Sequence, residues 1–364
     1  MKRKLAVAAR GLGNRVTGAQ KYIYDFINEL VQHQDDFEVH VYYNDCDHAG
    51  LFPQAQEHCL PSGSKLVWDH ILLPLAMKRD GMDIAIFPKG TKSLITSTKD
   101  VVIMLDLGYF YAWLNAYDRF DTIYMKAMMR YAAKRAWKLL AISESTRNDL
   151  VRVLSVPESK VAVIYAGCED MYKPVTDMNE LERVKQKYQF KEPFVFYPTS
   201  ISPRKNLTRL LDAFDLAGNE LSYHLYLTGA KGWNSQDVYE RLKKPEYDFV
   251  HLLGEVDEAD MPAIYALAEF SVYVSLFEGF GLPLLEAMRC GSPVLASDQT
   301  SVPEVTGNAA LVVDAFSVED IARGLCKMSE DAVLRQELRQ RGFEQAKMFS
   351  WQRVVQTTLV FLKD

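Results

Sequence analysis

The sequence predicts an α/β protein built from two domains, each with a doubly wound parallel sheet. Its 364 residues fit two domains at about 100–200 residues each. Short apolar runs of strand length alternate with amphipathic stretches of helix length along the chain, which is the rhythm of βαβ units. Because such sheets bind ligands at the carboxyl ends of their strands, we expect the functional residues there.

The first domain is expected over residues 1–172. Its predicted strands are Leu5–Ala9, Glu38–Tyr43, Asp83–Phe87, Val101–Leu105, Leu140–Ser143 and Val161–Tyr165, and its predicted helices are Ala19–Gln32, 122–140 and Glu144–Leu154. Most of these apolar runs end near a turn signal or an acidic residue, as parallel strands do before they enter a loop.

The second domain is expected over residues 173–349. Its predicted strands are Phe194–Tyr197, Tyr223–Thr228, Phe249–Leu253, Phe270–Ser275, Pro293–Ala296 and Ala310–Val313, and its predicted helices include Asp177–Tyr188 and Asn206–Leu216. A last helix is predicted over 350–364.

Composition excludes several classes of protein. The formal net charge is −6, from 42 basic and 48 acidic residues, which argues against a nucleic-acid binder. The apolar run Leu5–Ala9 is too short for a signal peptide, and no stretch reaches the ~18 apolar residues of a membrane span.

The five cysteines are few and widely spread. None forms a C-x-x-C pair, so we expect neither a zinc site nor a disulfide framework, and a reducing compartment fits. No two histidines have metal-ligand spacing, and no metal site is expected. The cysteines are Cys46, Cys59, Cys168, Cys290 and Cys326.

The most informative segment is the run Glu278-Gly-Phe-Gly-Leu-Pro-Leu-Leu-Glu286, which follows a predicted strand. Gly279 and Gly281 allow a ligand to approach the backbone, and Pro283 suits the start of a helix. A helix start of this kind attracts phosphate. The alternative is an ordinary loop with two solvated glutamates.

A cation pair, Arg204 and Lys205, follows the strand Phe194–Tyr197 and precedes a helix. Cations are unfavourable beside the positive end of a helix dipole, so their position there favours an anionic ligand such as a diphosphate. The alternative is a solvated basic pair.

At these residues the chain resembles the retaining family-4 glycosyltransferases of the GT-B fold, which have two Rossmann-like domains facing across a cleft. Glu278 to Glu286 resembles the family's E-x7-E element, and Pro203-Arg-Lys-Asn206 resembles P-R-K-N. Pro303-Glu-Val305 with the following Gly307-Asn-Ala-Ala-Leu-Val-Val-Asp314 resembles a further family stretch.

The resemblance implies a role for each matching residue. It assigns Glu286 to the donor ribose, Glu278 to the donor hexose, and Arg204 and Lys205 to the diphosphate. Backbone amides at Phe280, Gly281 and Leu282 are expected to meet the hexose and phosphates. The resemblance also implies an acceptor-binding first domain, onto which helix 350–364 packs back.

The glycine-rich segment Gly11 to Gly18 follows the first strand. It departs by one residue from the dinucleotide fingerprint, and Asp45 lies further on than a ribose-binding acid usually does. The resemblance instead places Gly18 beside the donor diphosphate. A plain glycine-rich turn is the alternative.

Asp106 ends the strand Val101–Leu105. The resembled family often has histidine before this aspartate, near the donor hexose, but this chain has Leu105. Asp106 either orients donor or acceptor or caps a turn.

Residues 122–140 place methionine, alanine and leucine on one helical face and cations with aromatic rings on the other. Such a face can rest on anionic lipid or meet a lipid-linked acceptor, and a solvated helix face is the alternative.

We therefore expect a cytoplasmic, metal-independent retaining hexosyltransferase that needs no cofactor, located peripherally on the inner face of the membrane if helix 122–140 binds lipid. Its expected partners are a nucleotide-sugar, with GDP-mannose favoured, and a glycan or lipid-linked acceptor in surface polysaccharide synthesis. The alternatives are a non-catalytic nucleotide-sugar-binding subunit, a sugar-nucleotide epimerase or hydrolase of the same fold, and, more distantly, a nicotinamide dehydrogenase.

Overall fold

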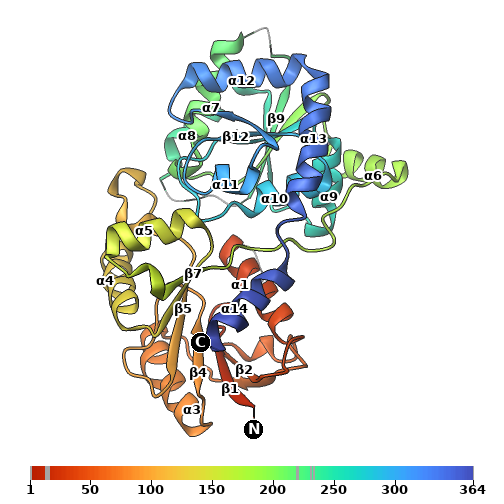
Figure 1. Cartoon of the computed structure of the whole chain (residues 1–364). Helices are drawn as coiled ribbons and strands as arrows, with labels where there is room; N and C mark the ends of the chain where they lie inside the picture. The colour runs from red at the N-terminus through yellow and green to blue at the C-terminus, as the bar shows by residue number, and fades with distance from the viewer. Residues whose placement is uncertain (1, 13–16, 219–220, 230–231, 233, 364) are drawn as a thin grey trace. The chain divides into compact units, whose positions relative to one another are not determined.

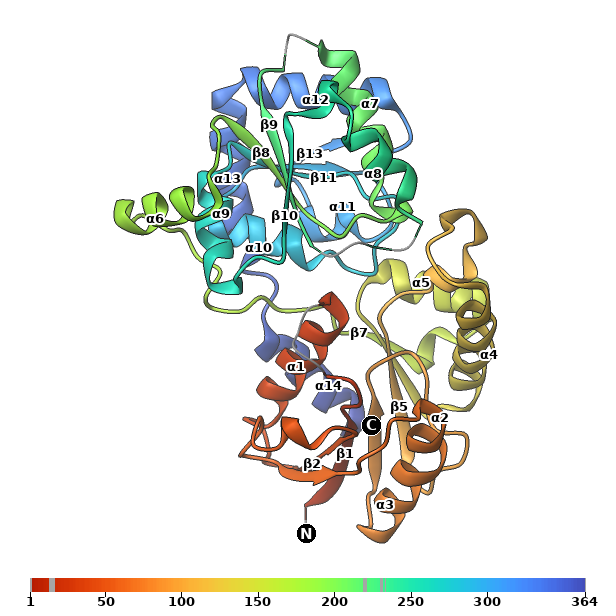
Figure 2. The same ribbon diagram turned by 180° about the vertical axis from the view of Figure 1, so that it is seen from behind.

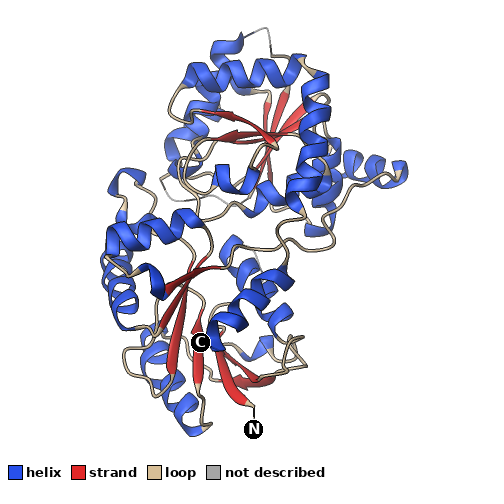
Figure 3. Cartoon of the chain, viewed as in Figure 1, coloured by secondary structure: helices blue, strands red, loops and turns tan. Residues whose placement is uncertain are grey.

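A computed structural model describes residues 2–12, 17–218, 221–229, 232 and 234–363 of the chain. The chain divides into two compact units. The first comprises Met1–Phe110, Arg119–Gly167 and Phe349–Asp364, and the second comprises Tyr111–Asp118 and Cys168–Met348. Each unit has a central sheet with helices on both of its faces (Figure 3).

The first unit contains a parallel sheet in the order β3-β2-β1-β4-β5-β6-β7. Its strands are β1 (Arg3–Ala8), β2 (Phe37–Tyr43), β3 (Gln56–Cys59), β4 (Ile84–Phe87), β5 (Lys99–Met104), β6 (Lys138–Ala141) and β7 (Val161–Val163). The chain adds β2 and β3 on one side of β1 and then returns to add the later strands on the other side.

The first unit's helices are α1 (Gly18–Leu30), α2 (Lys65–Val67), α3 (Leu73–Arg79), α4 (Arg119–Arg135), α5 (Glu144–Leu154) and α14 (Trp351–Lys363), and shorter turns include η1 (Cys46–His48) and the π-helical segment η2 (Trp68–Leu72). Helices η2, α3 and α4 cover one face of the sheet through a shared apolar core, and α1 lies beside α14 (Figure 1).

Helix α14 joins the first unit although it is last in the sequence. The ring of Trp351 lies 5.1 Å from that of Tyr22. A Cβ on Gly167 would lie 2.3 Å from the backbone nitrogen of Trp351, so only glycine fits there. Arg3 also donates to the Leu362 carbonyl at 3.1 Å. The last helix is therefore held by both ends of the first unit's sequence.

The second unit contains a parallel sheet in the order β10-β9-β8-β11-β12-β13. Its strands are β8 (Phe194–Pro198), β9 (His224–Thr228), β10 (Val250–Gly254), β11 (Phe270–Tyr273), β12 (Val294–Ser297) and β13 (Ala310–Val313). Its helices include α6 (Met178–Tyr188), α7 (Leu207–Ala217), α8 (Gln236–Leu242), α9 (Met261–Leu267), α10 (Leu282–Cys290), α11 (Val302–Thr306), α12 (Val318–Glu330) and α13 (Ala332–Ala346).

Two parallel-sheet, Rossmann-like domains agree with the predicted fold class, but three details differ from the prediction. The first is the segment Tyr111–Asp118, which we assigned to the first domain and which packs in the second unit. Its Leu114 joins an apolar cluster with Leu276 and Phe277, and the Tyr111 ring lies 5.2 Å from that of Phe277. These contacts are distant in sequence, so no local pattern indicated them.

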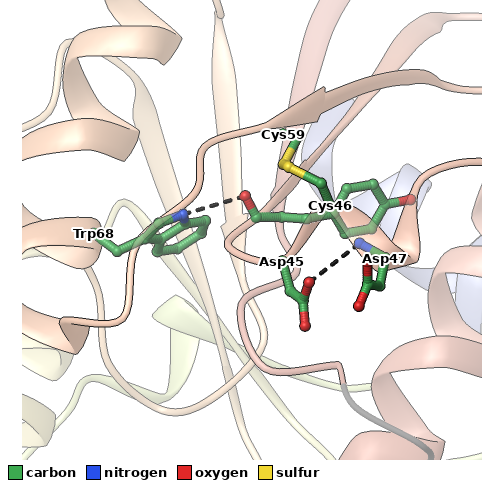
Figure 4. The surroundings of a disulfide bond; sticks show 6 residues. Asp45, Cys46, Asp47, Cys59 and Trp68 are labelled. Atoms are coloured by element: carbon green, nitrogen blue, oxygen red, sulfur yellow. Dashed lines mark hydrogen bonds between the residues drawn. A yellow bond between two sulfur atoms is a disulfide. The ribbon is translucent and has the colours of Figure 1, made fainter.

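The second difference is a disulfide between Cys46 and Cys59, whose Cα atoms are 5.4 Å apart (Figure 4). We expected no disulfide because the cysteine spacing matched no known framework. Strands β2 and β3 are neighbours, with Tyr43 opposite Cys59, and Cys46 follows Tyr43 after a short turn. Strand pairing therefore brings the two thiols together. Asp45 accepts a hydrogen bond from the Asp47 amide in this turn, at 3.1 Å (Figure 4).

The third difference concerns the helix predicted over 122–140. Helix α4 ends at Arg135, and Lys138 begins strand β6. Two aromatic rings assigned to its lipid-facing side make contacts inside the unit: the Lys65 Nζ lies 4.4 Å from the centre of the Tyr124 ring, and Tyr131 donates to the Leu94 carbonyl. The aromatic face we predicted is therefore partly used in packing.

Candidate functional site

In the second unit's sheet, the side on which the chain adds successive strands changes between β8 and β11. This change determines where the candidate site lies. From β8 the chain adds β9 and β10 on one side, and β11, β12 and β13 follow on the other. The loops after β8 and β11 therefore diverge from neighbouring strand ends and leave room for a ligand. Two hydrogen bonds join them, from the Leu276 amide to the Arg204 carbonyl at 2.8 Å and from Asn206 Nδ2 to the Val274 carbonyl at 3.0 Å.

A buried ion pair connects these two loops. Lys205 Nζ lies 2.6 Å from Glu278 Oε1, and their side chains are only 9% and 6% exposed. Arg204, which is less buried, places its Nη1 3.4 Å from the other carboxylate oxygen, Oε2. Lys205 also donates to the Tyr273 hydroxyl at 3.2 Å. The two predicted cations thus share one carboxylate at the point where the loops meet.

The charge state of this cluster follows from its surroundings. Burial favours the neutral form of Glu278, but the charges of Lys205 and Arg204 outweigh it and hold the pKa of the Glu278 carboxyl below its usual range. Burial, together with the Glu278 charge, raises the pKa of Tyr273 well above its ordinary value. At neutral pH the cluster holds two cations, one carboxylate and an uncharged phenol, an excess of one positive charge.

The loop after Glu278 is fixed from the following turn. The Glu278 amide donates to Thr300 Oγ1 at 3.0 Å, and Ser301 Oγ donates to the carbonyls of Glu278 and Phe280 at 3.0 and 3.1 Å. Gly281 ends the loop with a φ of +99°, which strongly favours glycine. A Cβ there would also lie 2.8 Å from Leu284 Cδ1.

Helix α10 starts directly after this loop. Its N-cap residue is Gly281, which has no side chain to cap the first turn. Leu282 and Pro283 are its first residues, so proline stands where its missing N–H costs least. An uncapped helix start beside two cations is a favourable place for an anion.

Glu286 lies one turn into α10 and is buried. Tyr265 donates to its Oε2 at 3.1 Å. Burial and the neighbouring Glu286 raise the pKa of Tyr265, so the phenol stays protonated as a donor. Tyr265, on α9, was not predicted as a site residue because nothing in its local sequence indicates which helix faces it.

The predicted donor residues Arg204, Lys205, Glu278, Phe280, Gly281, Leu282 and Glu286 thus lie on two adjoining loops and one helix of the second unit. Within this group, the structure places Arg204 and Lys205 directly against Glu278, a contact we had not predicted. Sequence analysis also missed Tyr273, Thr300 and Ser301, whose partners are all distant in sequence or on another element.

The remaining predicted residues lie in the first unit. Gly18 begins α1, directly after the N-cap residue Thr17, which forms a capping box with Gln20. Asp106 follows β5, and its Oδ1 accepts a hydrogen bond from the Gly108 amide at 2.8 Å, as a capping residue does. Residues 13–16 of the glycine-rich segment lie outside the described residues. The roles of Gly18 and Asp106 toward a donor therefore stay predictions.

Several other features bear on the site. A cavity of 720 Å³ lies along α7, α12 and β13 and is lined by none of the predicted donor residues. Over the described parts of the chain, no three His, Cys, Asp or Glu side chains are grouped so that they could hold a metal ion. A search of the same residues finds no helix long and apolar enough to span a membrane.

Two sequence models of known families match the chain. The one described as glycosyl transferases group 1 matches residues 178–345, and the one described as glycosyltransferase family 4 matches residues 16–170. Together they cover most of both units, including the cation pair, the glutamates and the loop between them.

Individual relatives agree with these matches. The chain is 34% identical over 240 residues to the O-antigen chain mannosyltransferase B of Escherichia coli. The aligned region covers 65% of this chain and 63% of that protein. It is 30% identical over 238 residues to a serotype-specific mannosyltransferase, WbdA, also of E. coli, which covers 64% of this chain but 29% of that protein. The chain thus spans less than two thirds of either relative.

A solved structure extends the likeness to the whole fold. The complex of Anabaena HepE with UDP-glucose superposes with a TM-score of 0.79 at 17% identity and covers 99% of both chains. At that identity the likeness concerns the fold alone. With two parallel-sheet units, the glutamate-bracketed loop and the two family matches, the chain belongs to the family-4 glycosyltransferases of the GT-B fold.

Proposed function

We propose that this chain is a retaining hexosyltransferase that moves a hexose from a nucleoside-diphosphate sugar to a glycan or lipid-linked acceptor in surface polysaccharide synthesis. The observation that carries the proposal is the contact of Arg204 and Lys205 with Glu278 beside the uncapped start of α10. GDP-mannose is our favoured donor, because the E. coli relatives are named as mannosyltransferases.

In this proposal the second unit grips the donor at three points. Glu286, held by Tyr265, accepts hydrogen bonds from the ribose hydroxyls. Arg204, Lys205 and the first amides of α10 receive the diphosphate. Glu278 contacts the hexose and also holds the Lys205 ammonium group in a fixed position. Since Lys205 needs no reorganisation when the donor arrives, its charge is preorganised for catalysis.

The reaction then follows from charge. As the bond between the anomeric carbon and the diphosphate oxygen breaks, its electron pair passes to the leaving diphosphate. Arg204 and Lys205 stabilise this growing negative charge, the task that a divalent metal performs in other transferases. The acceptor hydroxyl attacks the same face of the sugar and passes its proton to a phosphate oxygen. Gly18 and Asp106 are proposed to complete the site from the first unit.

A donor screen and a product assay test the proposal. Saturating donor stabilises the fold by RT ln(1 + [L]/Kd), about 2.7 kcal/mol at a hundredfold excess over Kd. Thermal-shift measurements with UDP-, GDP-, ADP- and dTDP-sugars should select one nucleotide. That donor should then yield nucleoside diphosphate only when an acceptor is present. The reaction should proceed equally in EDTA. NMR should show that the axial anomeric bond of the donor is retained in the product.

A second candidate, a non-catalytic nucleotide-sugar-binding subunit, is favoured by Leu105, which stands where the family often has histidine. Donor binding without turnover on any acceptor would support it. Release of nucleoside diphosphate or an altered sugar without an acceptor would instead support a hydrolase or epimerase.

We further propose a peripheral contact with the cytoplasmic face of a membrane. On α4, Phe120 and Ile123 are 84% and 68% exposed, and Arg130 and Lys134 are exposed on the same stripe of the helix. Apolar residues beside cations suit an anionic lipid surface. Replacing Phe120 and Ile123 by serine should reduce sedimentation with anionic vesicles, while neutral vesicles should bind neither the wild type nor this variant. Equal sedimentation of the wild type and the variant with anionic vesicles would contradict the proposed membrane contact.

The proposed cytoplasmic location can be tested through the redox state of the first unit's disulfide. The Cys46–Cys59 disulfide is unusual for a reducing compartment. If the chain is cytoplasmic, thiol-specific labelling of freshly lysed cells should find both cysteines reduced.

A further inference from the structure

The sheet of the first unit has a reversal point of its own. Its loops hold none of the second unit's donor residues, although the loop after β1 leads to Gly18, which is proposed above to meet the donor. Strands β1 and β4 are neighbours, with Leu5 opposite Ile84, while β2 and β3 lie on one side and β5, β6 and β7 on the other. The loops after β1 and β4 therefore diverge from adjacent strand ends, as the loops after β8 and β11 do. This is the position where doubly wound sheets bind ligands.

A small pocket of 30 Å³ opens at this point. Arg10 lines it from the loop after β1, Lys89 and Thr91 line it from the loop after β4, and Trp68 and Asp69 line it from η2. Figure 2 shows α2, which precedes η2, on the same side of the sheet as α4. The volume is about that of one water molecule and far below that of a sugar ring, so only a small polar group of a ligand, such as one phosphate oxygen, enters it.

Positive charge exceeds negative charge around this pocket. Arg10 pairs with Asp69, with 2.8 Å between Nε and Oδ1. Lys89 Nζ donates to the carbonyls of Arg10 and Gly11 at 2.8 and 3.1 Å, and within the described residues it meets no carboxylate at salt-bridge distance. Lys65, on α2, lies against the Tyr124 ring, within the electrostatic influence of Asp69 and Asp121. Three cations thus face two carboxylates, an excess of one positive charge.

A neighbouring lysine shows what a balanced pair looks like in the same region. Lys92 lies 2.8 Å from Asp100, with side chains 4% and 5% exposed. Asp100 also accepts hydrogen bonds from Thr96 and Thr98. That pair is compensated within the fold, so the excess belongs to the cations around the pocket.

The surrounding charges affect how readily these lysines hold a proton. Burial, with the charge of Arg10 and then that of Lys65, lowers the pKa of Lys89 to about 8, and Asp69 only partly opposes this. Burial and Arg10 lower the pKa of Lys65 as well. A bound anion would relieve this repulsion.

We propose that Arg10 and Lys89, with Lys65 adding to the local positive charge, form a binding site for a phosphate group at the reversal point of the first sheet. The positive excess and the planar guanidinium fork of Arg10 suit the several oxygens of a phosphate group. The Arg10 guanidinium group is held to Asp69 through Nε, so its two terminal nitrogens can donate hydrogen bonds to phosphate oxygens. If the chain transfers a hexose, as proposed above, this site selects acceptors that carry a phosphate group; phosphate binding itself does not rest on that function.

Competitive labelling of lysines with trace acetic anhydride tests the site in the full-length chain, because only the neutral amine reacts. The labelling of Lys89, followed by peptide mass spectrometry, should have a midpoint near pH 8. Saturating inorganic phosphate should raise that midpoint. A rise of one pH unit would cut the labelling of Lys89 at pH 8 about fivefold, while the exposed Lys78 on α3 should not change.

Two phosphate sources can be separated with the same readout. Lyso-phosphatidic acid below its micellar concentration is compared with lyso-phosphatidylcholine and with inorganic phosphate. Protection by inorganic phosphate supports a site for soluble phosphate groups, and protection by lyso-phosphatidic acid alone supports a lipid phosphate. Failure of both to protect Lys89, or equal protection by acetate, would overturn the proposal.

Variants locate the site and separate it from the donor site. Lys89→Met and Arg10→Gln should abolish calorimetric phosphate binding, Lys89→Arg should retain it, and the matched control Lys78→Met should leave it unchanged. Arg204→Gln, which weakens the proposed donor site, should still show phosphate protection of Lys89. Unchanged donor binding in Arg204→Gln, with phosphate protection intact, would therefore count against the proposed function alone.

Discussion

Replacing Lys205 by methionine tests the buried ion pair at the centre of the candidate site. The attraction between Lys205 and Glu278 across 2.6 Å is about 6 kcal/mol at an effective dielectric constant near 20. Desolvation of both groups offsets much of this in the wild type. Removing Lys205 leaves the buried carboxylate with only the longer contact to Arg204, 3.4 Å away, and breaking a buried pair typically costs about 3–5 kcal/mol. We expect a loss of stability of that size in the second unit at neutral pH.

The pH dependence has a definite sign. In the wild type the folded-state pKa of Glu278 is lowered, so its contribution is present above the unfolded-state value and is lost as pH falls through the folded-state value. Without Lys205, burial is opposed chiefly by Arg204, so we expect the folded-state pKa of Glu278 to rise above the unfolded-state value. The carboxyl then destabilises the variant increasingly as pH rises above the unfolded-state value of about 4.3. The stability difference between wild type and Lys205→Met should therefore shrink between pH 8 and pH 5.

Hydrogen exchange of peptides that cover β8 and β11 measures this in the full-length chain, because it reports the opening free energy of the second unit. The matched control Lys243→Met removes a lysine from an exposed pair with Glu240 and should cost less than about 1 kcal/mol. The double variant Lys205→Met/Glu278→Gln removes both charges and should recover much of the stability without recovering hexose transfer.

Two results would refute this reasoning. One is a loss in Lys205→Met no larger than that in Lys243→Met. The other is additivity within about 0.5 kcal/mol in the cycle with Glu278→Gln, which would mean that the two charges are not coupled.

Three further changes have expected outcomes. Gly281→Ala forces a side chain into a positive-φ position against Leu284, which should cost about 1–2 kcal/mol and weaken donor binding, measurable by calorimetry; unchanged affinity would remove this loop from the donor site. Tyr265→Phe deletes the hydrogen bond to Glu286 and should weaken nucleoside-diphosphate binding about tenfold, or 1.4 kcal/mol, with melting temperature as the control for folding. Cys59→Ser opens the disulfide loop and should lower the stability of the first unit by about 2–3 kcal/mol in oxidised protein; an equal loss in fully reduced protein would assign the effect to packing instead.

Much of the architecture could be predicted from local sequence. The helix Glu144–Leu154 was predicted to the residue, and β13 likewise, because capping residues and apolar runs act over a few positions. Strand β3 and the helices between Lys65 and Arg79 were not predicted. Strand β3 is a short edge strand without apolar alternation, and Pro74, in the first turn of α3, interrupts the helical pattern of this segment.

The same distinction between local and distant contacts applies to the candidate site. By itself, the sequence indicated the candidate site residues: the cations after β8, the glutamates around α10 and the glycine at its start, because each depends on its position at the end of a strand or helix. Only the tertiary structure decided that Lys205 pairs with Glu278, that Tyr265 holds Glu286 and that Arg10 lies beside Lys89. The Tyr265 contact depends on how α9 packs against α10. The other two depend on the order of strands in the two sheets, which brings together residues 73 and 79 positions apart in the chain, and no local pattern encodes that order.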